Sequence, residues 1–322
     1  MTNGMVTQVE TVWGWVLAAA QANRAGFDRT QPKAYAIDDS GQLIASTESV
    51  SRTVLDWIPG KGWVSRLPPE DALVPLLDLY LPIASSHADA PVTVGHLGQS
   101  LDGFIATATG DSYYVMGDEN VRHLHRMRAL CDAVIVGAGT IAADDPQLTT
   151  RRVAGPNPLR VVLDRTRRLD DEYGVFNDGQ SPTLLVCGES SKPAWPASEQ
   201  VEILRLPTPD GELDLAALVA ALRARGCARI FVEGGGVTVS GFLQARLLDR
   251  LQLAVAPLLI GDGRPAIRLP GTEALGDCLR PAHRIFRMGN DILFDCLLTA
   301  GGPATDETNS EGKGRPDIER IC

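Results

Sequence analysis

The sequence predicts an α/β domain with a mainly parallel sheet flanked by helices. From residue 92 onward, short apolar runs rich in β-branched residues alternate with stretches of helical periodicity. Strands that alternate with helices form parallel sheets covered on both faces. Near the C-terminus, residues 284–286 and 292–298 flank Gly289-Asn290-Asp291, which is typical of a hairpin. We therefore expect an antiparallel C-terminal edge hairpin on this sheet.

The composition is that of an ordinary globular protein, with 322 residues, 44% hydrophobic and 22% charged. The net charge of −10 argues against a nucleic-acid partner, which needs a basic face, but a local arginine cluster is enough to bind a small phosphorylated ligand. The six cysteines form no C-x-x-C pair and lie mostly in apolar runs, so we expect buried, reduced thiols. No signal pattern and no membrane-length apolar run is present, so we expect a cytoplasmic protein without a membrane partner.

The N-terminal part predicts a helix at residues 11–22 and a hairpin of residues 34–37 and 43–45. It also holds four tryptophans, which indicate either a small core of its own or a surface that packs on the rest. No catalytic motif is legible there. Three parts are expected: an N-terminal segment (1–88), a main domain (89–300) and a disordered tail rich in Gly, Pro and charge (301–322).

Within the main domain, Asp214 is a good N-cap for an amphipathic helix that Gly226 closes. The other helices are expected at residues 120–130 and 237–248. Strands are expected at 91–96, 132–136, 159–163, 183–187, 201–204, 229–232 and 251–256, followed by the terminal hairpin.

A glycine turn, Gly234-Gly235-Gly236, joins the strand at 229–232 to the next helix. Its free N–H groups and the positive end of the helix dipole suit a phosphate. The pattern is not the G-x-G-x-x-G fingerprint, and a tight structural turn explains it equally well. Glu233 is more informative, because a carboxylate at the end of a buried strand is costly unless it meets a polar partner.

Two further strand ends carry polar groups. One continues as Gly137-Ala138-Gly139-Thr140 and then Asp144, and the other ends at Asp164 and Arg165. Ligands of α/β proteins bind at the carboxyl ends of strands, and an arginine there can accept a 2′-phosphate and select NADP over NAD. A turn and a solvated basic loop are the alternatives.

The sequence lacks the hydrolase motif G-x-S-x-G, the P-loop that binds nucleoside triphosphates, and the zinc-protease motif H-E-x-x-H. It also lacks the zinc-deaminase signature, H-x-E with P-C-x-x-C. His123 and His125 lie two apart on a predicted helix and face different sides, so they form no metal pair. We expect no metal.

The ordered motifs are specific as a set. They stand as Gln99-Ser-Leu-Asp-Gly-Phe, Gly110-Asp-Ser, His125-Arg-Met-Arg-Ala, Asp132-Ala-Val-Ile-Val-Gly-Ala-Gly-Thr, Ala143-Asp-Asp-Pro-Gln-Leu-Thr-Thr-Arg, Pro158-Leu-Arg-Val-Val-Leu-Asp, Val232-Glu-Gly-Gly-Gly, Leu248-Asp-Arg-Leu and Ala256-Pro-Leu-Leu-Ile-Gly. From about residue 92 to 298 the chain resembles the reductase domain of the riboflavin-biosynthesis deaminase/reductase family, which has a dihydrofolate-reductase-like fold. Residues 1–88 carry no zinc ligands, so the resemblance is to a stand-alone form without the deaminase domain.

The resemblance implies a reaction. In this family, NADPH gives a hydride to the sugar C1 of a 5-amino-6-(5-phosphoribosylamino)uracil-type substrate, and the ribosyl group becomes ribityl. Family members are usually homodimers. The alternatives are an NADPH-dependent reductase of another pterin- or pyrimidine-like substrate, and a non-catalytic nucleotide-binding module.

The resemblance also implies site residues. His96 stands where many members carry lysine, and Tyr114 where tryptophan is common. Asp144 and Glu233 are the implied catalytic residues, and Asp144 could relay a proton. The implied substrate contacts are Ser112, Arg128, Leu148, Arg151 and Glu233, with the two arginines on the 5′-phosphate; the implied NADPH contacts are Gly98, Tyr114, Thr140, Asp144, Arg165, Gly234, Gly235, Gly236 and Val237.

Overall fold

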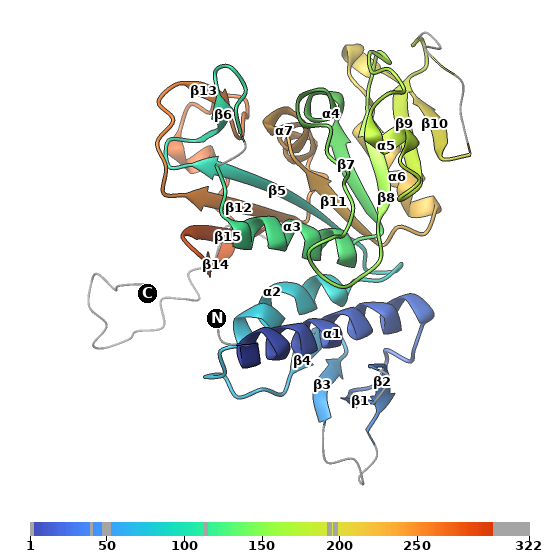
Figure 1. The fold of residues 1–322 in the computed structure, drawn as a ribbon, viewed down its shortest axis with the longest axis vertical. Helices are drawn as coiled ribbons and strands as arrows, with labels where there is room; N and C mark the ends of the chain where they lie inside the picture. Colours follow the sequence, from blue (N-terminus) through green and yellow to red (C-terminus); the bar gives the residue numbers. More distant parts are fainter. Residues whose placement is uncertain are drawn as a thin grey trace.

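The computed structural model describes residues 3–38, 41–46, 53–112, 115–191, 195 and 199–298. Within these ranges, nine strands form one large sheet in the order β10-β9-β8-β7-β11-β5-β12-β15-β14 (Figure 1). The strands are β5 (Val92–Ser100), β7 (Ala133–Gly137), β8 (Leu159–Leu163), β9 (Thr183–Gly188), β10 (Val201–Leu206), β11 (Arg229–Glu233), β12 (Arg250–Ala256), β14 (Ala282–Met288) and β15 (Asp291–Leu297).

Every neighbouring pair from β10 to β12 is parallel. The last two strands run the other way: β15 pairs antiparallel with β12, and β14 pairs antiparallel with β15 through a tight turn in which Met288 faces Asp291. The predicted fold, a mainly parallel sheet flanked by helices with an antiparallel C-terminal hairpin at its edge, is confirmed.

The central strands are buried on both faces, and alternate side chains enter different cores. On β7, Val134 and Val136 join one apolar cluster, while Ala133 and Ile135 join the other. Helix α3 (Asp118–Leu130) packs in the first cluster. Helices α6 (Leu215–Ala224) and α7 (Gly236–Gln244) pack in the second.

Local signals set most helix ends. The Asp214 side chain accepts a 2.9 Å hydrogen bond from the Ala217 N–H, which confirms it as the N-cap of α6. Helix α7 ends at Gln244, earlier than the expected residue 248, because Arg246 has a φ of +55° and the Leu247 N–H donates back to the Phe242 carbonyl at 3.0 Å. A turn was one of the two alternatives for the Gly137–Thr140 stretch; in the structure Gly137 ends β7 and residues 138–140 begin helix α4 (Ala138–Asp144). The short helix α5 spans Gly174–Asn177.

The N-terminal segment forms a second, smaller layer. Its antiparallel sheet has the order β2-β1-β3-β4, with β1 (Lys33–Ile37), β2 (Leu43–Ala45), β3 (Thr53–Ile58) and β4 (Gly62–Ser65). The predicted β1–β2 hairpin is confirmed. Helix α1 (Asn3–Ala25) is longer than expected, and helix α2 (Val74–Ala84) was not anticipated.

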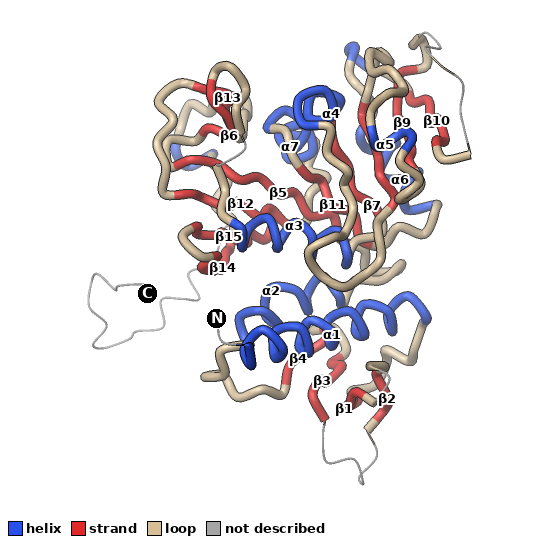
Figure 2. The backbone as a smooth tube through the Cα atoms, viewed as in Figure 1, coloured by secondary structure: helices blue, strands red, loops and turns tan. Residues whose placement is uncertain are grey.

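Helices α1 and α2 lie between the small sheet and the large sheet with its helix α3 (Figures 1 and 2). The core is continuous across this junction, because Trp13, Trp57 and Trp63 belong to the same buried cluster as Met127 and Val134. The segment therefore has its own sheet and also packs on the main domain. No helix in the described part of the chain is long and apolar enough to cross a membrane.

Candidate functional site

A cavity of about 1460 Å³ opens at the carboxyl ends of the parallel strands. Its wall is made by β5, by the ends of β7, β8 and β11, and by helices α4 and α7. Figure 1 shows α4 and α7 side by side. A two-stranded sheet, β6 (Phe104–Thr107) with β13 (Gly263–Pro265), covers one side. Carboxyl strand ends are where open α/β sheets bind their ligands.

The glycine turn before α7 forms a cradle in this wall. Gly234 and Gly235 have φ of +78° and +50°, in the left-handed region that favours glycine. A Cβ on Gly236 would lie only 2.0 Å from the carbonyl oxygen of Ala266, so the backbone passes too close for a side chain. The first turn of α7 leaves N–H groups without helical partners, and these face a cavity with room for an anion.

Two side chains complete the cradle. The Thr140 hydroxyl lies 3.1 Å from the place that a Cβ on Gly235 would take, so it caps the same opening from α4. Val237 is 88% exposed although it is apolar, and it lines the cavity. An open glycine cradle, a hydroxyl and an uncovered apolar side chain fit a dinucleotide that carries both phosphates and a flat ring.

The end of β8 presents cations to the cavity. Arg165 lines it, with its guanidinium held by the Gly211 carbonyl at 2.5 Å and by Glu212 at 3.9 Å. Asp164 also lines the cavity, but it is buried and one of its carboxylate oxygens accepts the Leu169 N–H at 2.8 Å. One oxygen of the acidic group that would bind a ribose 2′-hydroxyl is therefore already engaged, while the positive charges of Arg165 and Arg168 line the cavity nearby.

A buried ion pair lies behind the other end of the cavity. Arg128 of α3 donates two hydrogen bonds to the Glu233 carboxylate, one of them from Nε at 2.8 Å. The Arg128 guanidinium also donates to the Thr149 carbonyl at 3.2 Å. Glu233 is 8% exposed and lines the cavity, whereas Arg128 does not. We expected Glu233 to have a polar partner, and in the structure this partner is the guanidinium of Arg128 in the same chain.

The loop after α4 is held in a strained shape between two arginines. Leu148 has φ of +54° and is fully buried at the cavity wall. Arg128 binds the Thr149 carbonyl on one side of it, and Arg160 of β8 binds the Gln147 carbonyl at 3.3 Å on the other. A leucine in the left-handed region costs free energy and persists only where its surroundings hold it.

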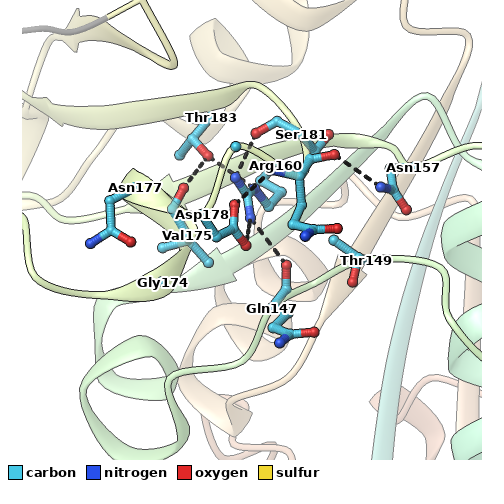
Figure 3. A network of polar contacts seen from close by, with 12 residues as sticks. Gln147, Thr149, Asn157, Arg160, Gly174, Val175, Asn177, Asp178, Ser181 and Thr183 are labelled. Carbon is cyan, nitrogen blue, oxygen red and sulfur yellow. Dashed lines mark hydrogen bonds and ion pairs between the residues drawn. The ribbon is translucent and has the colours of Figure 1, made fainter.

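Arg160 is fully buried and forms the centre of the network in Figure 3. Besides Gln147, its guanidinium binds the Asp178 carboxylate at 2.8 Å, the Thr183 hydroxyl at 3.0 Å and the Ser181 carbonyl at 2.5 Å. Because a buried guanidinium needs its donors satisfied, this set fixes the loop against the sheet.

Arg151 continues the same loop at the surface. It is exposed, its guanidinium donates to the Thr149 hydroxyl at 2.9 Å, and its backbone N–H donates to His125 Nδ1 at 3.0 Å. Burial and the nearby arginines lower the pKa of His125 to about 4, so this acceptor is neutral. Arg151 is not among the residues that line the cavity, and its contact with a phosphate stays a prediction.

Asp144 ends helix α4 at the cavity mouth. Partial burial raises the pKa of its carboxyl, and Arg264 of β13 opposes this shift. Arg264 also reaches the backbone of Gly110, where a Cβ would meet its guanidinium at 2.5 Å. A carboxyl group with a raised pKa at a cavity mouth is suited to hold and release a proton.

The structure brings most of the sequence-predicted residues to one cavity, and two of them, Gly98 and Ser112, line it near Met116. Tyr114 lies outside the described residues. The predicted residues that line the cavity are Gly98, Ser112, Thr140, Asp144, Leu148, Arg165, Glu233, Gly234, Gly235, Gly236 and Val237.

The family model of the RibD C-terminal domain matches residues 92–294.

The chain belongs to the RibD C-terminal domain family.

Its relatives include both stand-alone and longer members of that family. The chain is 34% identical over 213 residues to the 2,5-diamino-6-ribosylamino-4(3H)-pyrimidinone 5′-phosphate reductase of Methanothermobacter thermautotrophicus, covering 64% of this chain and 97% of the archaeal protein. It is 33% identical over 220 residues to the riboflavin biosynthesis protein RibD of Escherichia coli, covering 64% of this chain and 58% of that protein.

Solved structures of RibD proteins have the same fold. The Thermotoga maritima deaminase/reductase matches with a TM-score of 0.53 and 26% identity, over 64% of this chain and 56% of that one. Acinetobacter baumannii RibD matches with a TM-score of 0.55 and 24% identity, over 70% of this chain and 62% of that one. The chain thus spans little more than half the length of these two RibD structures.

Beyond the motifs of the RibD family, the structure adds residues that sequence reasoning missed. Asn120, Arg264 and Arg268 line the cavity from α3 and from the β12–β14 connection. A lone asparagine in a helix and arginines in a loop carry no pattern that separates a cavity wall from a solvated surface. The two arginines line the cavity because β6 and β13 pair and cover this side of it.

Proposed function

We propose that this protein reduces the ribosyl group of a 5-amino-6-(5-phosphoribosylamino)uracil-type substrate to a ribityl group in riboflavin biosynthesis, with NADPH as the hydride donor. Membership of the RibD C-terminal domain family carries this proposal, and the archaeal relative named as a pyrimidinone 5′-phosphate reductase is covered almost completely. The protein is a reductase of the RibD type.

The cofactor end of the cavity is the glycine cradle. The first turn of α7, the Thr140 hydroxyl and the uncovered Val237 would hold the dinucleotide, and Arg165 would meet the 2′-phosphate. A bound reduced nicotinamide supplies the hydride for C1 of the substrate.

The substrate end is the wall of Glu233 and Leu148. The Glu233 carboxylate, oriented by Arg128, accepts hydrogen bonds from ribose hydroxyls. Arg151, exposed on the neighbouring loop, would bind the 5′-phosphate. When the hydride adds to C1 of the ring-opened imine, the CH=N group becomes CH2–NH, and the nitrogen takes one proton. Asp144, which lines the cavity and has a carboxyl pKa raised by burial, would donate that proton.

The test follows NADPH oxidation at the nicotinamide absorbance band. Full-length protein is mixed with NADPH and the phosphoribosylamino-pyrimidine, with the dephosphorylated compound in a parallel sample. We expect oxidation with the phosphorylated substrate and a much higher KM without the phosphate. NADPH binding without oxidation of either sample would contradict a reductase role with this substrate class.

Coenzyme choice is tested by Arg165→Ala. Loss of a charge-assisted contact to the 2′-phosphate is expected to lower kcat/KM for NADPH by about 10- to 100-fold, while the NADH value stays nearly unchanged. The matched control is Arg205→Ala on β10, since Arg205 binds the carbonyl groups of Gly188, Glu189 and Ser191 and does not line the cavity. Equal kcat/KM for both coenzymes in the unmodified protein would contradict the Arg165 role.

We further propose a homodimer in the cytoplasm with no nucleic-acid partner. Exposed apolar side chains gather near the end of β12, where Leu101, Leu258 and Leu259 are uncovered, and the net charge is −10. A single monomer mass in light scattering at micromolar concentration would contradict the dimer.

A further inference from the structure

A chain of buried hydrogen bonds runs from the large sheet to the N-terminal segment. Its direction is fixed at Asp295, whose carboxylate can only accept and takes a hydrogen bond from Gln252 Nε2 at 3.3 Å. The Gln252 Oε1 atom therefore faces His123 Nε2, 3.0 Å away, and that nitrogen must carry the hydrogen. His123 Nδ1 is then the acceptor, and the Tyr80 hydroxyl donates to it at 2.7 Å.

The chain ends beside the cavity. The His123 ring packs on His96, with ring centroids 5.2 Å apart, and His96 Nε2 lies 3.3 Å from Asn120 Oδ1. His96 and Asn120 both line the cavity, and His96 pairs in register with Glu233 on the neighbouring strand. Tyr80 is thus two contacts away from the substrate wall, although it belongs to α2 of the N-terminal segment.

We propose that the N-terminal segment is a working part of the reductase site, and that Tyr80 is a positioning residue that holds His123 in its Nε2–H tautomer and, through the His123 ring, holds His96 at the cavity wall. This inference rests on the proposed function.

The groups around the two histidines agree with this role. Tyr80 from α2, Gln252 from β12 and Arg126 from α3 surround His123, and Glu233 from β11 lies beside His96. Burial holds the pKa of His123 well below its ordinary value and lowers that of His96 to about 4. A proton on His123 Nδ1 would remove the acceptor for Tyr80 and place a buried positive charge against the neutral His96 ring and close to Arg126.

The test variant is Tyr80→Phe, which removes one oxygen from a ring that is 1% exposed and keeps the packing against Trp13. Without the donor, Nδ1 is free to take a proton, so the pKa of His123 rises. Because burial and Arg126 still lower this pKa, it stays below the ordinary histidine value. We expect kcat to fall severalfold relative to the unmodified protein as the pH drops from about 6.5 to about 5, with recovery above about pH 6.5, because only the neutral ring supports His96. The KM for NADPH should not change.

The matched control is Tyr35→Phe. Tyr35 is also buried in the N-terminal segment, but it packs among Phe27 and Trp63 on the small sheet, away from the cavity. Both variants lose one phenol oxygen from a buried tyrosine of the N-terminal segment, so a general loss of stability affects both. Superimposable pH profiles for the two variants, measured in a protein that does reduce its substrate, would overturn the Tyr80 role and leave the proposed function intact.

A second measurement needs no variant. Long-range ¹H–¹⁵N spectra of the full chain report the tautomer of each histidine, and we expect His123 as the Nε2–H form throughout the range between about pH 5 and pH 8. An Nδ1–H form, or a titration of His123 within that range, would overturn the proposal. If the unmodified protein fails to oxidise NADPH while His123 keeps the expected tautomer, the proposed function fails and the positioning contact stands.

Discussion

Arg128 and Glu233 are 105 residues apart in the sequence, yet they form a two-point ion pair between α3 and β11 at the wall of the cavity. Both side chains are almost completely buried. Since Arg128 also binds the Thr149 carbonyl, one guanidinium connects a helix, a strand end and the strained Leu148 loop. The ion pair therefore stabilises the fold and also fixes the geometry of the site.

Arg128→Met is expected to destabilise the protein by about 3–5 kcal/mol, because it leaves the Glu233 carboxylate buried without a partner. Urea unfolding measures this change. The double variant Arg128→Met with Glu233→Met should recover most of that loss, since no charge is then left unpaired. The control is Arg225→Met, which breaks the exposed pair with Glu202 and should cost less than about 1 kcal/mol. Equal losses of unfolding free energy in Arg128→Met and Arg225→Met would show that the buried pair contributes no more stability than the exposed one.

The glycine cradle predicts a contrast between two glycines at the cavity. A Cβ on Gly236 would meet backbone carbonyl oxygens at 2.0 and 2.5 Å, whereas on Gly139 the nearest atom is a flexible Arg168 nitrogen at 3.7 Å. Gly236→Ala should therefore abolish NADPH binding and lower Tm, while Gly139→Ala, at an exposed position in helix α4, should leave Tm unchanged or slightly raised. Fluorescence titration with NADPH and thermal melts decide this. Normal NADPH binding by Gly236→Ala would exclude the cradle as its site.

Much of the large sheet was predictable, because its strands are buried on both faces and appear in the sequence as short apolar runs between glycine and charged turns. Residues 159–163 match β8 end to end, and the terminal hairpin is confirmed through its Gly289-Asn290 turn. Helix α4 was missed because the two glycines and the threonine of Gly137-Ala138-Gly139-Thr140 are poor helix formers and give the stretch the pattern of a turn.

The parts that could not be predicted depend on distant contacts. The ion pair of Arg128 with Glu233 joins residues whose sequence neighbours give no hint of each other. Likewise, Tyr80 sits in an apolar helix that carries no motif, and its role depends on where α2 packs against α3. Sequence patterns locate strand ends, and therefore the cavity, but they do not show which buried side chains meet behind it.

Substitution of Arg160 is expected to change the KM for the pyrimidine substrate much more than the KM for NADPH. Arg160→Met removes the hydrogen bond that holds the Gln147 carbonyl and leaves Asp178 without its guanidinium, so the Leu148 turn should relax. We expect a Tm loss and a rise of about tenfold or more in the KM for the pyrimidine substrate, with little change in the KM for NADPH. Arg160→Lys keeps one contact and should recover part of the substrate KM. An equal rise in both KM values would indicate general unfolding instead of a loop effect.

Three buried histidines predict how stability depends on pH. Burial lowers the pKa of His96 and of His125 to about 4, and that of His123 falls well below its ordinary value. The unfolded chain, with ordinary histidines, binds protons first as the pH falls below about 6.5, so the folded state loses stability from there down toward about pH 4 and is fully stable above that window.

The change of the unfolding free energy with pH can be measured. Each histidine that stays neutral only in the folded chain contributes about 1.4 kcal/mol per pH unit within this window. Urea unfolding between about pH 6 and pH 5, above the range where most carboxylates titrate, should therefore show a steep fall in the free energy of unfolding. His96→Gln removes one proton-binding site from the unfolded chain and should flatten the fall by about a quarter to a third, since three buried histidines contribute and His87, whose pKa is also lowered by burial, adds a smaller part. His283→Gln, at an exposed position on β14, is the control. In this variant the difference in unfolding free energy between about pH 6 and pH 5 should stay much nearer that of the unmodified protein.

An equally steep fall in His96→Gln would mean that His96 takes up its proton in the folded chain. The cavity wall would then carry a charge that the packing of His96 against His123 and Phe231 does not accommodate.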